Sequence, residues 1–160
     1  GRPRPGGGRG RPPMVYVPRD EHTPPSLENY ELVARVLARG LSAGTADVEE
    51  VAREYGAEWV RSERAEGAAP LTFAESLGEL DRFLHRAGFA PEVVVGDEEA
   101  EVRIHNCPFR AMAEEDRAVP CTVHLGVMQG VLDGVRSGGQ VERLDPFVTP
   151  RLCLARVSTA

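Results

Sequence analysis

The chain has 160 residues, a formal net charge of −6 and 41% hydrophobic residues. This content supports one modest core or two small ones, and no apolar run approaches the roughly 18 residues that a membrane span requires. We therefore expect a soluble protein that does not contact a membrane. Three cysteines form no disulfide-dense framework, and no charged-then-apolar leader is present, so we expect a reducing compartment and hence the cytoplasm.

Charge is unevenly distributed along the chain. Residues 1–19 contain five arginines and no acidic residue, which leaves a formal charge of −11 on residues 20–160. Prolines and glycines exclude a helix from the first thirteen residues, so this segment is either a flexible linker or a basic loop that leads into a strand at 14–17. Basic side chains bind nucleic acid through its phosphates, and the predicted DNA contacts are Arg2, Arg4, Arg9 and Arg11.

Two amphipathic helices are expected within residues 20–66. Apolar residues recur every three or four positions over 27–41, after a possible cap at Ser26, and again over 48–59, after Asp47. Each helix has an apolar stripe that needs a partner. The stripes could pack on each other, on the following domain or on a second copy of the chain, and their extent favours a homodimer.

Residues 67–160 are predicted to form an α+β domain with a small antiparallel sheet. Thr72 and Glu75 have the spacing of a capping box that opens a third helix, which Gly88 would end. Strands are expected at 93–95 and 101–105, joined as a hairpin, and at 141–144 and 152–157. Between these two pairs, Pro120 can start a helix in which Gly126, Gly130 and Gly134 leave a groove for close approach of another backbone.

The three cysteines are the candidate site. Thirteen residues separate Cys107 from Cys121 and thirty-one separate Cys121 from Cys153, while His124 follows Cys121 by three positions. Cys107 lies just beyond a predicted strand, Cys121 in the first turn of a helix and Cys153 in a late strand, so all three could meet at one rim of the sheet. The alternative is that each is a small buried apolar residue. At a helix N-terminus we expect Cys121 to have a lowered pKa, which would make it a good ligand or nucleophile.

Several motifs resemble those of winged-helix regulators in the broad ArsR-like group related to the iron–sulfur repressor SufR. The resemblance rests on Asn106-Cys107-Pro108-Phe109, on Cys121-Thr122-Val123-His124 and on the late Cys153 in the C-terminal half. Residues 10–17 resemble the end of the wing hairpin in these proteins, and residues 30–41 resemble their dimerising helix.

The resemblance implies a ligand- or cofactor-sensing and dimerisation portion of a transcriptional repressor. It implies an iron–sulfur cluster held by Cys107, Cys121 and Cys153, with His124 as a possible fourth metal ligand and with zinc or no metal as alternatives. The recognition helix of a winged helix precedes its wing, and none is found in this sequence. We therefore expect the chain to be a fragment whose DNA-reading helix lies upstream of Gly1.

The predicted organisation has three parts: a basic wing remnant at 1–19, a helical dimerisation segment at 20–66 and an α+β sensor domain at 67–160. The predicted function is binding rather than catalysis: a cofactor or small ligand at the cysteine rim would change the geometry of a homodimer on DNA. A small metal- or thiol-dependent redox protein using Cys121 is the first alternative. The second is an interaction module whose tail, through 9–12, resembles an AT-hook.

Overall fold

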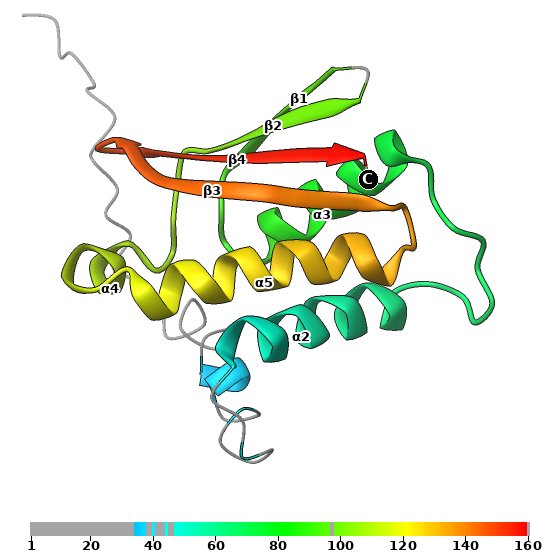
Figure 1. Ribbon diagram of the computed structural model, residues 1–160, viewed down its shortest axis with the longest axis horizontal. Helices are drawn as coiled ribbons and strands as arrows, with labels where there is room; N and C mark the ends of the chain where they lie inside the picture. The colour runs from blue at the N-terminus through cyan, green and yellow to red at the C-terminus, as the bar shows by residue number, and fades with distance from the viewer. Residues whose placement is uncertain (1–33, 38–39, 41–43, 45–46, 97, 160) are drawn as a thin grey trace, which may run out of the picture.

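The computed structural model describes residues 34–37, 40, 44, 47–96 and 98–159. In this part of the chain a sheet forms one layer, two helices cover one of its faces, and a further helix packs beneath them (Figure 1). The covering helices are α3 (Phe73–Arg86) and α5 (Ala118–Gly134), and the helix beneath α5 is α2 (Val48–Ser62). The predicted mixed α+β class is confirmed. None of the helices among the described residues has the length and apolarity that a membrane crossing requires.

The sheet is antiparallel, with the order β1-β2-β4-β3. Its strands are β1 (Pro91–Val95), β2 (Glu99–Ile104), β3 (Gly139–Thr149) and β4 (Leu152–Thr159). The predicted hairpin and the two closing strands are therefore present. Strand β2 lies between β1 and β4, and its last residue, Ile104, pairs with Cys153 near the start of β4.

Helix α3 begins and ends as its local sequence predicts. The Thr72 side chain accepts from the Glu75 amide and the Glu75 carboxylate accepts from the Thr72 amide, which is a complete capping box. At the other end Gly88 has a φ of 85°, and the Phe89 amide donates to the Leu84 carbonyl at 2.9 Å. This turn directs Phe89 back into the core.

Helices α2 and α5 pack backbone against backbone. A Cβ added at Gly126 would lie 2.5 Å from the Glu49 carbonyl oxygen, one at Gly130 would overlap the Arg53 carbonyl oxygen, and one at Gly134 would lie 2.8 Å from the Ala57 carbonyl oxygen. The predicted groove therefore exists, and α2 of the same chain fills it. Because the buried face of α2 is already covered by α5, this face no longer supports the homodimer. Most of the 27–41 stripe lies outside the described residues.

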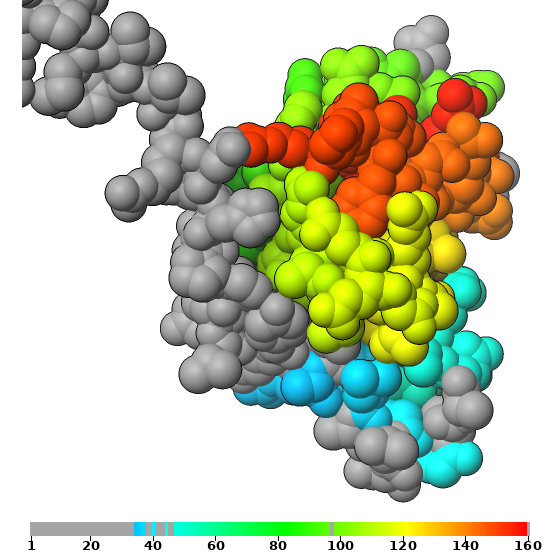
Figure 2. Space-filling view, turned by 90° about the vertical axis from the view of Figure 1, so that its left-hand side faces the viewer, coloured from blue at the N-terminus to red at the C-terminus, as the bar shows by residue number. Residues whose placement is uncertain are grey.

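Two features near the cysteines were not predicted. A short helix, α4 (Arg110–Glu115), follows β2, and strand β3 is longer than expected because it continues past Pro146 with register shifts between Val141 and Arg143 and between Asp145 and Thr149. Figure 2 shows this end of the molecule, where α4 and the first turns of α5 (yellow-green to yellow) lie against the β3–β4 connection (orange to red).

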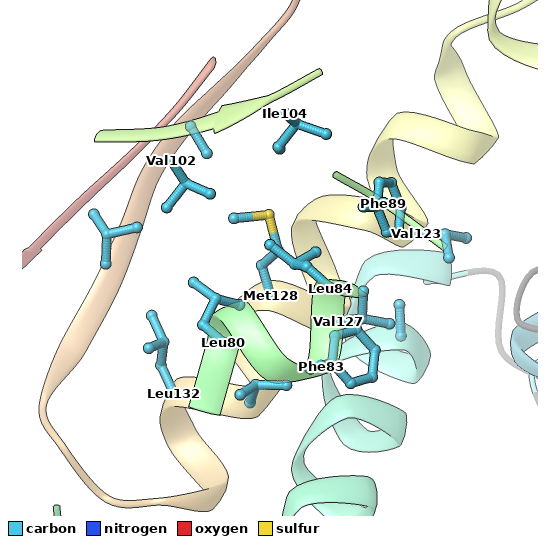
Figure 3. Close-up of a cluster of buried hydrophobic side chains, with 14 of the residues drawn as sticks. Leu80, Phe83, Leu84, Phe89, Val102, Ile104, Val123, Val127, Met128 and Leu132 are labelled. Carbon is cyan, nitrogen blue, oxygen red and sulfur yellow. The ribbon is translucent and has the colours of Figure 1, made fainter. Parts of the chain in front are cut away.

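One hydrophobic core joins the layers. In Figure 3 side chains from α3, α5 and β2 point toward one another around Met128. The same cluster contains Val51 and Val60 of α2 and Val36 from the helical residues 34–37. The predicted helical segment and the predicted sensor domain thus share a core. Trp59 packs against this core, with the centre of its ring 4.8 Å from that of Phe83 in an edge-to-face arrangement.

Candidate cysteine site

The fold brings the three cysteines to one end of the sheet. Cys153 pairs with Ile104, the last residue of β2, and Cys107 follows Ile104 by three positions, so these two thiols lie at the junction of β2 and β4. Helix α4 then leads into α5, whose first turn carries Cys121. All three are free thiols; Cys153 is buried, and Cys107 and Cys121 are half-buried.

The three thiols lie close enough to influence one another electrostatically. The pKa of Cys107 is raised to about 12, mainly by burial and to a smaller extent by the Cys153 and Cys121 thiols. Burial likewise raises the pKa of Cys121, with a contribution from Cys153, and burial raises that of Cys153. Ionising a thiol that is removed from water and faces a second thiolate requires much free energy. All three thiols are therefore protonated at neutral pH unless they bind a metal cation.

Two of the sulfur atoms accept backbone hydrogen bonds. The Phe109 amide donates to the Cys107 sulfur, which lowers the Cys107 pKa and opposes the effect of burial. The Phe147 amide donates to the Cys153 Sγ at 3.4 Å and acts in the same direction on Cys153. Such bonds favour the thiolate, and in iron–sulfur proteins they help to set the reduction potential.

Two arginines also act on the thiols. Arg110 of α4 lowers the pKa of Cys107 and Cys153, and Arg117, the N-cap residue of α5, lowers that of Cys121 and Cys153. Both guanidiniums lie over the ring of Phe147, at 5.9 Å for Arg110 and 5.1 Å for Arg117 from the ring centre. The three thiols therefore lie in a partly positive environment.

The expected lowered pKa of Cys121 is wrong in direction. Its position in the first turn of α5 is as predicted, but burial and the nearby Cys153 outweigh the favourable effect of Arg117. Unliganded Cys121 is therefore a poor nucleophile at neutral pH.

His124 lies deep in the core and is 3% exposed. Its ring stacks on Phe89 with the ring centres 4.2 Å apart, and Phe89 in turn meets Phe109 edge to face. Burial lowers the pKa of His124 to about 3, and Nε2 has no hydrogen-bond partner among the described residues. His124 is thus neutral and packed against aromatic rings, while the thiols interact with one another and with arginines.

Within the described part of the chain, no three His, Cys, Asp or Glu side chains are arranged to hold a single metal ion. A zinc ion bound by three thiolates and His124 would need these side chains to lie closer together than they do. The four predicted DNA contacts, Arg2, Arg4, Arg9 and Arg11, lie outside the described residues.

Sequence reasoning missed Arg110, Arg117 and Phe147 as parts of this site. Arg110 and Arg117 flank the short α4, which lacks a side-chain cap, and Phe147 is brought to the site by an irregularity of β3. The sequence did offer one sign of their role: Arg110 follows Cys107 by three residues, and Arg117 precedes Cys121 by four.

The chain was also compared with known proteins. No protein-family model matches it, and no curated protein is significantly similar to it. The fold and the site define an α+β protein with a cluster of three thiols at one end of its sheet.

Proposed function

We propose that this chain is the sensor portion of a winged-helix transcriptional regulator and that Cys107, Cys121 and Cys153 hold its iron–sulfur cluster. The observation that carries the proposal is the convergence of three free thiols from separate elements, two of which accept amide hydrogen bonds. Independent core cysteines have no reason to meet at one end of a sheet and to share two nearby arginines.

The donor set suits a cluster better than a single ion. In a [4Fe–4S] cluster each thiolate binds a different iron atom, so the sulfur atoms need not surround one point. Three thiolates also match the soft donors that iron–sulfur clusters require. When bound, such a group would supply a centre that responds to redox conditions, while the chain's own residues would supply three ligands, two N–H donors and two cations.

The route from this site to DNA would run through the helices. Cys121 lies on α5, α5 packs on α2, and α2 belongs to the predicted helical segment 20–66, which follows the basic residues 1–19 in the sequence. In the proposed mechanism, binding at the thiols favours one arrangement of these helices over another in a homodimer, and hence one spacing of its DNA-binding parts.

Reconstitution tests the cluster. Anaerobic protein treated with ferrous iron and sulfide should acquire visible thiolate-to-iron absorption, and replacing Cys107, Cys121 or Cys153 by serine should each reduce it. The triple serine variant measures nonspecific iron, and the Tm of every variant separates loss of ligand from loss of fold. Since Cys153 is buried, Cys153→Ala is the better matched variant there.

If the wild-type protein stays colourless after reconstitution and has a normal Tm, it does not bind an iron–sulfur cluster. Full colour in the single variants would remove the three-cysteine site. His124→Ala should leave the colour unchanged if His124 only packs on Phe89, and a loss equal to that of a cysteine variant would identify it as the fourth ligand.

DNA binding tests the regulatory part of the proposal. We expect this chain to bind duplex DNA weakly through phosphates, with affinity that falls steeply as salt rises and with little sequence preference. Arg9→Gln with Arg11→Gln should reduce the slope of log K against log salt by about two. Fluorescence anisotropy measures both, with Arg82→Gln as the control, and a sequence-selective complex at physiological salt would favour the AT-hook-like alternative instead.

The thiol-dependent redox protein is the weaker candidate. Catalysis by Cys121 requires a thiolate at neutral pH, and burial raises the pKa of this thiol. If the protein does not acquire a cluster on reconstitution, the better proposal is a sensor that binds a small organic ligand at the same thiols.

A further inference from the structure

The irregularity of β3 lies opposite Cys153. Residues Asp145 and Thr149 pair with Leu154 and Leu152 respectively, so β3 has extra residues where β4 has only Cys153. Within this bulge Phe147 has a φ of 53°. A bulky aromatic residue rarely adopts a left-handed backbone, and it keeps this conformation only where its surroundings enforce it. Bulges of this kind redirect side chains next to functional sites.

The contacts of Phe147 account for its conformation. Its amide points at β4 and donates to the Cys153 Sγ, while its ring faces the Arg110 and Arg117 guanidiniums. One residue of β3 thus connects Cys153, α4 and the start of α5. Two guanidiniums repel each other, and the negative face of a shared aromatic ring offsets part of that repulsion.

Charged side chains surround the contact between Phe147 and the two guanidiniums. Arg110 lowers the pKa of Cys107 and Cys153, and Arg117 lowers that of Cys121 and Cys153. Each thiol therefore has at least one guanidinium nearby. Glu114, one turn along α4, opposes the guanidinium charge and pairs with Arg110 at 2.7 Å. Asp116 accepts from the Ala118 amide at the start of α5.

We propose that Phe147 is a positioning residue that holds the Arg110 and Arg117 guanidiniums beside the three thiols. As a result, the site prefers a bound group whose complex with the three thiolates has a net negative charge. The inference uses the cysteine site of the proposed function and adds to it the charge of the ligand and the residue that selects it. A bound group of charge +2 becomes a net anion once three thiolates hold it, and two fixed guanidiniums stabilise that anion where water is scarce.

The experiment compares two alkylating reagents on the metal-free, reduced protein. Iodoacetate is an anion and iodoacetamide is neutral, yet both have nearly the same size and both react with the thiolate. The ratio of their rates at one cysteine therefore cancels its thiolate fraction and its accessibility and reports the local potential. Limited alkylation at low salt, read at each cysteine by mass spectrometry, gives the ratio, and the same protein in urea gives the reference.

In the folded protein the ratio at the half-buried Cys107 and Cys121 should exceed that in urea. Arg110→Gln combined with Arg117→Gln should lower it by roughly threefold, the size of effect expected for partly exposed charges. Phe147→Leu should also lower it, although both arginines are still present, and Phe147→Tyr should restore it because the ring is kept. Glu114→Gln should raise the ratio, and Arg82→Gln, a distant exposed arginine of α3, should leave it unchanged.

A ratio at Cys107 and Cys121 that is the same in folded and unfolded protein, or that the double arginine variant leaves unchanged, would overturn the inference. A ratio that falls in the arginine variant but not in Phe147→Leu would overturn the role of Phe147. These outcomes do not depend on a cluster: colourless protein with a raised ratio contradicts the proposed cofactor and supports the anionic preference. A coloured protein with no raised ratio does the reverse.

Discussion

Gly130→Ala should destabilise the protein by about 3 kcal/mol or more, because the new methyl group would overlap the Arg53 carbonyl oxygen of α2 and would lie 2.9 Å from the Ala57 amide nitrogen. Neither atom belongs to a flexible side chain, so the two helices must separate. For a domain of this size the Tm should fall by roughly 6–12 °C. Urea unfolding and thermal melting measure both quantities.

Gly78→Ala is the matched control. Gly78 also lies inside a helix, but it is exposed, and an added Cβ would meet no atom of the described chain within 4 Å. This change should stabilise the protein by up to about 1 kcal/mol through helix propensity alone. The opposite signs isolate the packing of α2 on α5, and equal stability of the two variants would show that these helices do not pack as described.

Acid should destabilise the protein through His124. Burial lowers the pKa of His124 to about 3, whereas in the unfolded chain it has its ordinary value near 6.5. Below that value the unfolded chain binds a proton that the folded protein does not, so stability is lost as the pH falls from about 6.5 toward 3. The loss should be about 2 kcal/mol between pH 7 and pH 5. Urea unfolding at several pH values measures it.

His124→Leu should remove this dependence. Because Nε2 has no partner in the described structure, the variant should be at least as stable as the wild type at pH 7 and more stable at pH 5. His85→Leu, at an exposed histidine of α3, is the matched control variant. The carboxylates of Glu75 and Glu92 have lowered pKa values, so their contributions are lost below their ordinary value of 4.5, which lies outside the range between pH 7 and pH 5. Identical pH profiles for wild type and His124→Leu would contradict a neutral, buried His124.

Local sequence signals predicted most of the elements. The reciprocal pair Thr72 and Glu75 and the glycine at position 88 define both ends of α3 within four residues of sequence each, so no distant contact was needed. Helix α4 was missed because its six residues include no capping side chain. Strand β3 was cut short because Pro146 normally ends a strand, whereas here it opens a bulge.

The site was only partly predictable. The end of β2, the start of α5 and the late strand β4 could be expected to meet, which placed the three cysteines together. Their pKa values could not be predicted, because burial depends on the whole core and reverses the effect expected at the start of α5. His124 looked like a ligand from its spacing to Cys121, but the structure stacks it on Phe89, a residue that the turn at Gly88 brings inward.

The glycine contacts between α2 and α5 have a mechanical meaning. Where side chains separate two helices, rotamer changes can absorb a small displacement of one of them, but Gly126 and Gly130 bring the two backbones into direct contact. The two helices are therefore expected to move together as one rigid unit. A displacement of the first turn of α5, where Cys121 lies, would move α2 as well, because the backbones leave no room for one helix to shift past the other.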